Sequence, residues 1–292
     1  MKQPTHRLAP LALAGALALA LAACKKDQTT PPPDGGATTA GDPAASDPAP
    51  AGVPQEPDPP AIAEARAQVL RGDFQPAAAA LQPLLDDLKR REQLRASGLA
   101  AAWLALAVVH DVAENAHQPA EHALAMAERT GDKEVQVAAK IAFGAYNLGI
   151  EHLPEAAQAL EEAYKLDGQG PNAALALVYF GEAKIAMAFD GDDKIANPGE
   201  LDTAAGTFRK AKDLAAGQAG NEVLAARATV GLAAVARYKN DAGNACDLIN
   251  EALAGYGSAG AAVYLTDGAQ ALKDAANCQA KAAPKADPKK KK

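Results

Sequence analysis

The chain has 292 residues and a formal net charge of −7, and 49% of its residues are hydrophobic although only 4% are aromatic. Alanine alone occupies 76 positions. Ala has the highest helix propensity and lets helix axes approach closely, so this composition favours packed helices. It argues against β-sandwiches and β-barrels, whose strands need β-branched and aromatic residues.

Residues 1–23 have the parts of a secretion signal. Lys2 and Arg7 give a positively charged start, and residues 8–23 form an uncharged Leu/Ala run, shorter than the roughly 20 residues that a membrane span needs. The run ends in Leu-Ala-Ala followed by Cys24. This ending resembles the lipobox of bacterial lipoproteins, which implies cleavage before Cys24 and lipid on its sulfur and on the new amino terminus. The alternative is an ordinary secretory signal with a cysteine at its end by chance.

The lipoprotein resemblance also implies where the mature protein resides. A multi-chain lipid anchor is stable, because each buried methylene contributes about 0.8 kcal/mol to membrane binding. Lys25 stands where an Asp would, in the best-known sorting rule, hold a lipoprotein at the inner membrane. We therefore expect a protein that is lipid-anchored to the outer membrane and faces the periplasm. Removal of residues 1–23 takes away two positive charges and changes the formal charge from −7 to −9, which disfavours nucleic acid as a partner.

The segment 24–60 is expected to be a disordered tether behind the lipidated cysteine. Residues 31–60 contain ten of the 20 prolines of the chain, together with Gly, Ala, Ser, Thr and Asp and almost no large apolar side chains. Such a composition cannot bury enough apolar surface to offset the entropy lost on ordering. At roughly 3 Å per residue, the segment reaches up to about 100 Å from the lipid head groups. An unselected low-complexity insertion is the alternative.

Residues 61–280 show a helical pattern throughout, with apolar residues at three- and four-residue spacing. Gly, Pro, Asp and Asn interrupt the pattern where helices are expected to begin and end. The pattern predicts helices at 60–71, 75–89, 91–115, 118–129, 133–151, 154–166, 171–189, 199–216, 220–239, 241–254 and 260–279.

A short pattern recurs on every second helix of this series. It consists of a small residue, a large residue four positions later and, in four of its five copies, Ala seven positions later. The copies start at Ala77, Ala120, Ala156, Ala204 and Ala245. Gly144 and Ala233 stand twelve residues before two of these starts, where the preceding helix needs a small residue to let its neighbour approach.

This arrangement resembles tetratricopeptide repeats (TPRs), whose first helix carries a small residue and whose second helix carries a small, large and small triad. The starts are 43, 36, 48 and 41 residues apart, which is longer than the 34 residues of the family. The resemblance implies an all-α, TPR-like α-solenoid of about five helix pairs, with 260–279 as a C-terminal capping helix and 61–280 as the repeat domain. A generic Ala-rich α-solenoid is the alternative.

Repeat solenoids bind extended segments along the surface formed by their first helices. In the expected register this surface carries Tyr179, Glu182, Arg227, Arg237 and Tyr238, and Arg and Tyr are frequent interface anchors. We expect these residues to bind a partner. The corresponding positions of the second and third pairs are apolar, so they either accept a peptide or form the core of a tightly wound superhelix. These positions are Ala105, Val109, Val112, Ala138, Ile141, Ala145 and Leu148.

Cys246 and Cys278 remain after lipidation of Cys24 and form an even pair for an oxidising compartment. A bond between them would close a loop of about 30 residues and stabilise the fold by roughly 3 kcal/mol. A helical hairpin centred near Gly257 would instead place Cys246 opposite residues around 268, about 12 Å along the axis from Cys278. The sequence therefore leaves the disulfide open.

No motif predicts catalysis, a metal site or a cofactor. Residues 255–260 match the GxGxxG string, but a helix rather than a strand precedes them, so we interpret them as a helix-to-helix turn. His117 and Glu121 are not part of an HExxH arrangement. Residues 190–200 depart from the order of a calcium loop, because Lys194 stands where an oxygen ligand should be. We expect a protein that is not an enzyme.

Residues 281–292 end the chain with six Lys and one Asp, a net charge of +5, against −10 for residues 61–280. We expect a disordered tail that is either solvated without function or in contact with an anionic surface.

The sequence as a whole predicts a lipid-anchored scaffold or adaptor that binds cell-envelope proteins through its helical-repeat groove. The alternative is a structural envelope lipoprotein that contacts cell-wall polymer through its basic tail. The identity of the partner and the oligomeric state stay open.

Overall fold

A computed structural model describes residues 57–190 and 194–278. The signal segment, Cys24, most of the tether and the tail 281–292 lie outside the described residues. So do residues 191–193, which belong to the sequence considered as a calcium loop.

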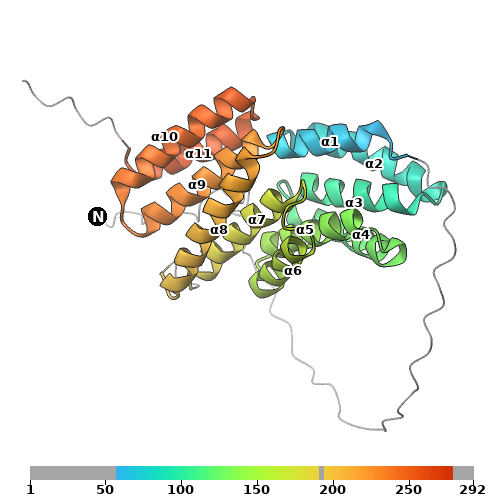
Figure 1. Ribbon diagram of the computed structural model, residues 1–292, viewed down its shortest axis with the longest axis horizontal. Helices are drawn as coiled ribbons and strands as arrows, with labels where there is room; N and C mark the ends of the chain where they lie inside the picture. Colours follow the sequence, from blue (N-terminus) through green and yellow to red (C-terminus); the bar gives the residue numbers. More distant parts are fainter. Residues whose placement is uncertain (1–56, 191–193, 279–292) are drawn as a thin grey trace, which may run out of the picture.

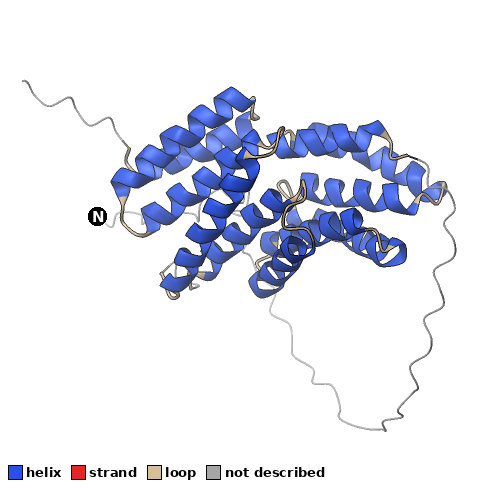
Figure 2. Ribbon diagram, viewed as in Figure 1, coloured by secondary structure: helices blue, strands red, loops and turns tan. Residues whose placement is uncertain are grey.

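The described residues form eleven α-helices and one 3-10 helix, and none of them belongs to a strand (Figures 1 and 2). The first helices of five pairs are α1 (Pro60–Arg71), α3 (Leu94–Val108), α5 (Lys133–Gly149), α7 (Ala173–Met187) and α9 (Glu222–Tyr238). The second helices are α2 (Phe74–Arg90), α4 (His117–Thr130), α6 (Leu153–Leu166), α8 (Pro198–Ala216) and α10 (Ala242–Ala259). The 3-10 helix η1 (Ala113–Ala116) precedes α4, and α11 (Val263–Ala275) follows the last pair. The chain is an all-α solenoid.

The sequence pattern located all eleven helices, but several of its boundaries were wrong. The long helix predicted at 91–115 is α3 followed by η1, and α3 begins only after Glu92, which has a φ of 54°. Helix α5 likewise ends at Gly149, two residues earlier than predicted, and Glu151 beyond it has a φ of 63°. Left-handed residues at helix ends are usually Gly or Asn, so glutamates at these positions carried no signal in the sequence.

The first helices form an inner layer that closes on itself. Helices α1, α3, α5, α7 and α9 contact one another in succession, and α9 also contacts α1. The backbone amide of Ala262, in the turn before α11, donates a hydrogen bond of 2.8 Å to the carbonyl of Arg71 at the end of α1. Figure 1 shows α1, in blue, beside the orange and red helices of the C-terminal end. The last pair therefore returns to the first, and the two ends of the solenoid meet.

Small residues let neighbouring helices approach where the repeat pattern required it. A Cβ added to Gly144 of α5 would lie 2.5 Å from Cγ of Leu160 in α6, which is closer than atoms pack. Leu160 and Phe208, two of the predicted large residues, are fully buried. Leu124 is only half-buried, and Met126 packs opposite Gly98 of α3 instead. The pattern was thus correct for α6 and α8 and shifted within α4.

The inner face of the second and third pairs is filled by the protein itself. Ala105, Ala138, Ile141 and Ala145 are at most 3% exposed and belong to one hydrophobic cluster that runs from α1 to α9. Alanines on facing helices bring the backbones close enough to leave no groove at these positions. Of the two interpretations left open by the sequence, the structure supports the core of a tightly wound superhelix for these four positions. Val109 and Leu148 are half-buried against the same cluster, and Val112 is exposed, so these three positions are not part of the core.

Candidate functional site

Three of the residues expected to bind a partner lie inside the molecule. Tyr179, Glu182 and Arg227 are 3%, 7% and 7% exposed. Nε and Nη2 of Arg227 in α9 each donate a hydrogen bond of 2.9 Å to an oxygen of the Glu182 carboxylate in α7. The guanidinium also packs over the Tyr179 ring, 4.5 Å from its centre. The structure corrects the expectation for these three residues, because their polar groups pair with one another in the interior instead of facing a partner. We call them the inner polar cluster.

The charges of the inner polar cluster follow from its burial. Burial alone would lower the pKa of Arg227, but the facing Glu182 carboxylate raises it above its ordinary value, so the guanidinium stays protonated. Burial raises the pKa of Glu182, and Arg227 opposes this shift. The bidentate geometry is that of an ionised pair. Burial also raises the pKa of Tyr179, which therefore remains a phenol that can donate its proton.

His110 extends this cluster toward the first pair, and nothing in the sequence indicated it. Its Nε2 lies 3.0 Å from the Tyr179 hydroxyl, and its ring stacks on Phe74 of α2 at 3.9 Å between centres. Burial, assisted by the positive charge of Arg227, lowers the pKa of His110 to about 3, so the imidazole is neutral and Nε2 shares a hydrogen bond with the Tyr179 hydroxyl. Tyr264 of α11 lies edge-on to both His110 and Phe74. The polar residues thus connect the fourth and fifth pairs to the first.

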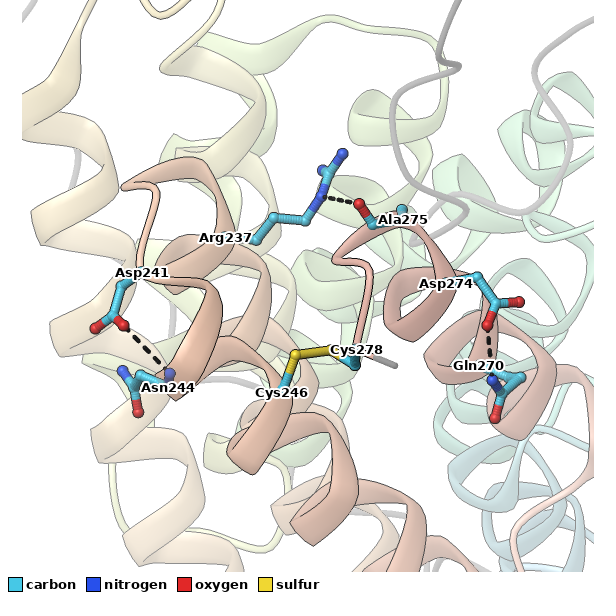
Figure 3. Close-up of a disulfide and its surroundings, with 8 residues drawn as sticks. All are labelled: Arg237, Asp241, Asn244, Cys246, Gln270, Asp274, Ala275 and Cys278. Atoms are coloured by element: carbon cyan, nitrogen blue, oxygen red, sulfur yellow. Dashed lines mark hydrogen bonds between the residues drawn. A yellow bond between two sulfur atoms is a disulfide. The ribbon is translucent and has the colours of Figure 1, made fainter. Parts of the chain in front are cut away.

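Arg237 and Tyr238, the other two expected partner residues, lie half-buried at the opposite end of α9. Nε of Arg237 donates a hydrogen bond of 3.4 Å to the carbonyl of Ala275, the last residue of α11 (Figure 3). The Tyr238 ring packs edge-on against Phe189 at 4.6 Å between centres. Both side chains thus contact neighbouring elements of the same chain, and they lie apart from the inner polar cluster.

An open cleft lies on the outer face between α6 and α8, with α7 beneath it. Its volume is about 310 Å³, and its lining residues are Glu161, Tyr164, Leu177, Phe180, Thr203, Gly206, Thr207 and Lys210. Nζ of Lys210 lies 4.3 Å from the centre of the Tyr164 ring. A Cβ at Gly206 would meet no other atom within 4 Å, so the cleft is open at this point. An apolar floor with a few polar groups at its rim is typical of a site for a side chain of a partner.

The sequence did not reveal the outer cleft. Phe208 and Ala211 of α8 follow the repeat pattern and are buried, whereas Gly206 lies on the exposed side of the same helix. A glycine at an exposed position in the middle of a helix is destabilising, by roughly 0.5–1 kcal/mol relative to Ala. That residue was the only sign in the sequence that this side of α8 differs from an ordinary solvated face.

Cys246 and Cys278 form a disulfide, with their Cα atoms 5.5 Å apart (Figure 3). The doubt raised by the sequence came from a wrong helix end. Helix α10 continues through Gly255 and Gly257 to Ala259, and only Gly260, with a φ of 65°, is in the turn. A hairpin centred there places Cys246 opposite the end of α11. The first five residues of the GxGxxG string therefore belong to α10. Only its last residue, Gly260, lies in the helix-to-helix turn that the sequence predicts.

No group of three or more His, Cys, Asp or Glu residues in 57–190 and 194–278 could hold a metal ion. Nε2 of His117 lies 3.0 Å from Oε1 of Glu121 one turn later on the exposed side of α4. Within the same ranges, none of the helices combines the length and apolar character that a membrane crossing requires.

No protein-family model matches the chain, and no curated protein matches its sequence. Among solved structures, it is similar to a Podosopora anserina protein described as a putative kinesin light chain with nearly identical TPR-like repeats. That alignment has a TM-score of 0.43 and 15% identity and covers 67% of this chain and 93% of the other. A single-residue variant of the same protein aligns with a TM-score of 0.44 and 13% identity, over 75% of this chain and 96% of the other.

Proposed function

We propose that this protein is a lipid-anchored cell-envelope scaffold that binds partner proteins, and that partners bind in the outer cleft between α6 and α8. The observation that carries the proposal is the contrast between the two faces of the solenoid. The inner face is filled by alanines and by the inner polar cluster, whereas the outer cleft is open and lined by Tyr164, Phe180 and Lys210. We assign no catalytic role to the protein.

The cleft favours an extended peptide that carries an apolar side chain next to a carboxylate. Tyr164, Leu177 and Phe180 supply apolar surface. The Glu161 carboxylate at the rim lies 2.8 Å from Nζ of Lys165, which offsets its charge. No carboxylate of the described chain pairs with Lys210, so this ammonium is available to an acidic group of the partner. Burial of an apolar side chain would contribute most of the affinity, and Lys210 would contribute orientation.

A blocking substitution tests this binding site. Gly206→Phe places a ring in the cleft, and Gly257→Phe is the matched control, because Gly257 is also an exposed helical glycine whose Cβ would meet nothing within 4 Å. A photoreactive residue at Thr203, on the rim, is used to crosslink partners in intact cells. We expect a discrete crosslinked protein that disappears with Gly206→Phe and persists with Gly257→Phe. Equal capture by both variants would contradict a cleft-bound partner.

The anchor has its own test. Cys24→Ala should prevent incorporation of labelled palmitate and move the protein from the membrane fraction to the soluble fraction. Retention on membranes without the cysteine would contradict lipid anchoring while leaving the cleft proposal intact.

The basic tail supports a second function, contact with cell-wall polymer. Its net charge of +5 at residues 281–292 is opposite to that of the repeat domain. Deletion of 281–292 should then abolish co-sedimentation with purified cell wall without changing the proteins crosslinked from Thr203. Unchanged co-sedimentation would remove this function.

A further inference from the structure

The N-terminal end of α11 is attached to the first helix pair. The amide of Ala262 binds the Arg71 carbonyl, and the side chain of Leu265 covers Gly72, where an added Cβ would lie 2.8 Å from the Leu265 Cγ. The ring of Tyr264 lies 5.2 Å from that of Phe74, between centres. The first turn of α11 therefore bridges the last and first pairs.

The remainder of α11 is secured chiefly at its other end. Only Ala269 and Leu272 of this helix are buried. Just beyond its last residue, the disulfide from Cys278 to Cys246 ties the chain to α10. Burial of one alanine and one leucine is a small contribution for a helix of 13 residues, so the covalent bond carries much of the attachment.

The first turn of the same helix borders the inner polar cluster at His110. Tyr264 lies 5.7 Å from His110 between ring centres, and His110 contacts the Tyr179 hydroxyl. Tyr179 in turn packs under Arg227. In the repeat register Tyr179 and Arg227 belong to the inner face on which solenoids bind peptides. Here the first turn of α11 reaches that face through His110, and α1 contacts α9.

We propose that α11 is a lid at the edge of the inner polar cluster and that the Cys246–Cys278 disulfide secures it in addition to the contacts of its first turn. Reduction of this bond by a dithiol lets the whole helix detach. One thiolate of the dithiol attacks a sulfur of the bond and forms a mixed disulfide, and the second thiolate releases it. The protein gains two electrons and two protons as two cysteine thiols, and the dithiol becomes a disulfide. Both cysteines are half-buried rather than enclosed, so a reductant can reach them. This inference goes beyond the proposed function, because the outer cleft does not include α11.

The test compares the oxidised and the dithiothreitol-reduced full chain, with Cys24→Ser so that only the two bonded cysteines respond. Amide hydrogen exchange and modification by an arginine-specific dicarbonyl are followed by mass spectrometry. Reduction should raise exchange in 263–275 by roughly a hundredfold, since closure of a loop of this length shifts an opening equilibrium by about that factor or more. It should also make Arg227 reactive, while Arg209, which is exposed on α8, reacts equally in both states.

Trp103, 2% exposed in α3, reports whether the rest of the fold survives. We expect unchanged Trp103 emission on reduction, because the lid does not touch α3 at this position. Unchanged exchange in α11 with unreactive Arg227 would overturn the proposal, and so would loss of the buried Trp103 signal together with faster exchange in every helix.

Two variants test the attachments at the two ends of α11 one at a time. The double substitution Cys246→Ser and Cys278→Ser should reproduce the reduced state without any reductant. Tyr264→Ala with the disulfide intact should raise Arg227 reactivity less than the double substitution does, because α11 stays tied to α10. A larger effect of Tyr264→Ala would contradict the disulfide as the main attachment.

Discussion

Two parts of the inner face are closed by different means. In the second and third pairs, Ala138 and Ile141 occupy the positions that face the axis, and close helix packing fills the space. In the fourth and fifth pairs, the equivalent surface carries Glu182 and Arg227, and the space is filled by a bidentate ion pair with an aromatic ring beneath it. The repeat register alone marks the polar part as a binding surface and leaves the apolar part open between a groove and a core. Only the path of the whole superhelix decides that both are interior.

Loss of the ion pair between Glu182 and Arg227 should have the largest effect on the free energy of unfolding. Glu182→Ala should lower the free energy of unfolding by about 3–5 kcal/mol, because it leaves the Arg227 charge buried without a partner. The double variant Glu182→Leu with Arg227→Met should recover most of this loss, since apolar residues of similar volume remove both charges. Urea unfolding measures both. A loss below about 1 kcal/mol for Glu182→Ala would mean that Arg227 reaches solvent and that this part of the inner face is open.

In the apolar second and third pairs, stability should depend on side-chain volume at the helix contacts and not on charge. Gly144→Ala should cost about 1–3 kcal/mol in unfolding free energy, because the new Cβ would meet Leu160 at 2.5 Å. Gly206→Ala is the control and should stabilise the protein by about 0.5–1 kcal/mol, as its Cβ meets open space in a helix. If Gly144→Ala had no cost, the packing of α5 on α6 would be looser than described.

The polar part should respond to mild acid through His110. The folded pKa of His110, about 3, lies below its unfolded value near 6.5. The folded state therefore binds fewer protons, and the stability from neutral His110 is complete above pH 6.5 and is lost as the pH falls from there toward 3. Between about pH 7 and pH 5.5, the unfolding free energy should fall by about 1 kcal/mol more than in His110→Gln. If the unfolding free energies of the unsubstituted protein and of His110→Gln fell equally with pH, His110 would be in solvent.

Of the changes considered, loss of a surface ion pair should have the smallest effect on the free energy of unfolding. Lys239 and Asp202 form a contact between α9 and α8 with side chains 40% and 74% exposed. Lys239→Ala should change the unfolding free energy by no more than about 0.5 kcal/mol, and less at high salt, because solvent already screens both charges. A loss comparable to that of Glu182→Ala would show that burial does not explain the difference between the two pairs.

The sequence determined the helices and their pairing well, because local spacing and alanine content carry that information. It did not determine which face is open, because closure depends on the sum of the four small rotations between the five pairs and on contacts such as Ala262 to Arg71, which are far apart in the chain. The outer cleft was missed for a related reason. Its residues on α6 and α8 look like ordinary solvated positions, and Leu177 and Phe180 of α7 look like ordinary core positions, so only Gly206 stood out from its surroundings. The disulfide was uncertain because its geometry depended on where α10 ends.

The most direct test of the closed solenoid is a crosslink between its two ends. The Cβ position at Gly72 lies 3.5 Å from Cβ of Ala262, which is within reach of a disulfide. Gly72→Cys with Ala262→Cys should oxidise to a second intramolecular disulfide that peptide mapping identifies. The chain keeps Cys246–Cys278 and carries Cys24→Ser and Leu265→Ala, the latter because the Leu265 Cγ would lie 2.8 Å from the new Cβ. Gly131→Cys with Ala262→Cys is the matched control, because Gly131 is also a left-handed glycine after a helix, in the α4–α5 turn, and no other residue packs on it. Free thiols or intermolecular dimers in the Gly72 variant would contradict closure and return the inner face to the binding groove that the sequence predicts.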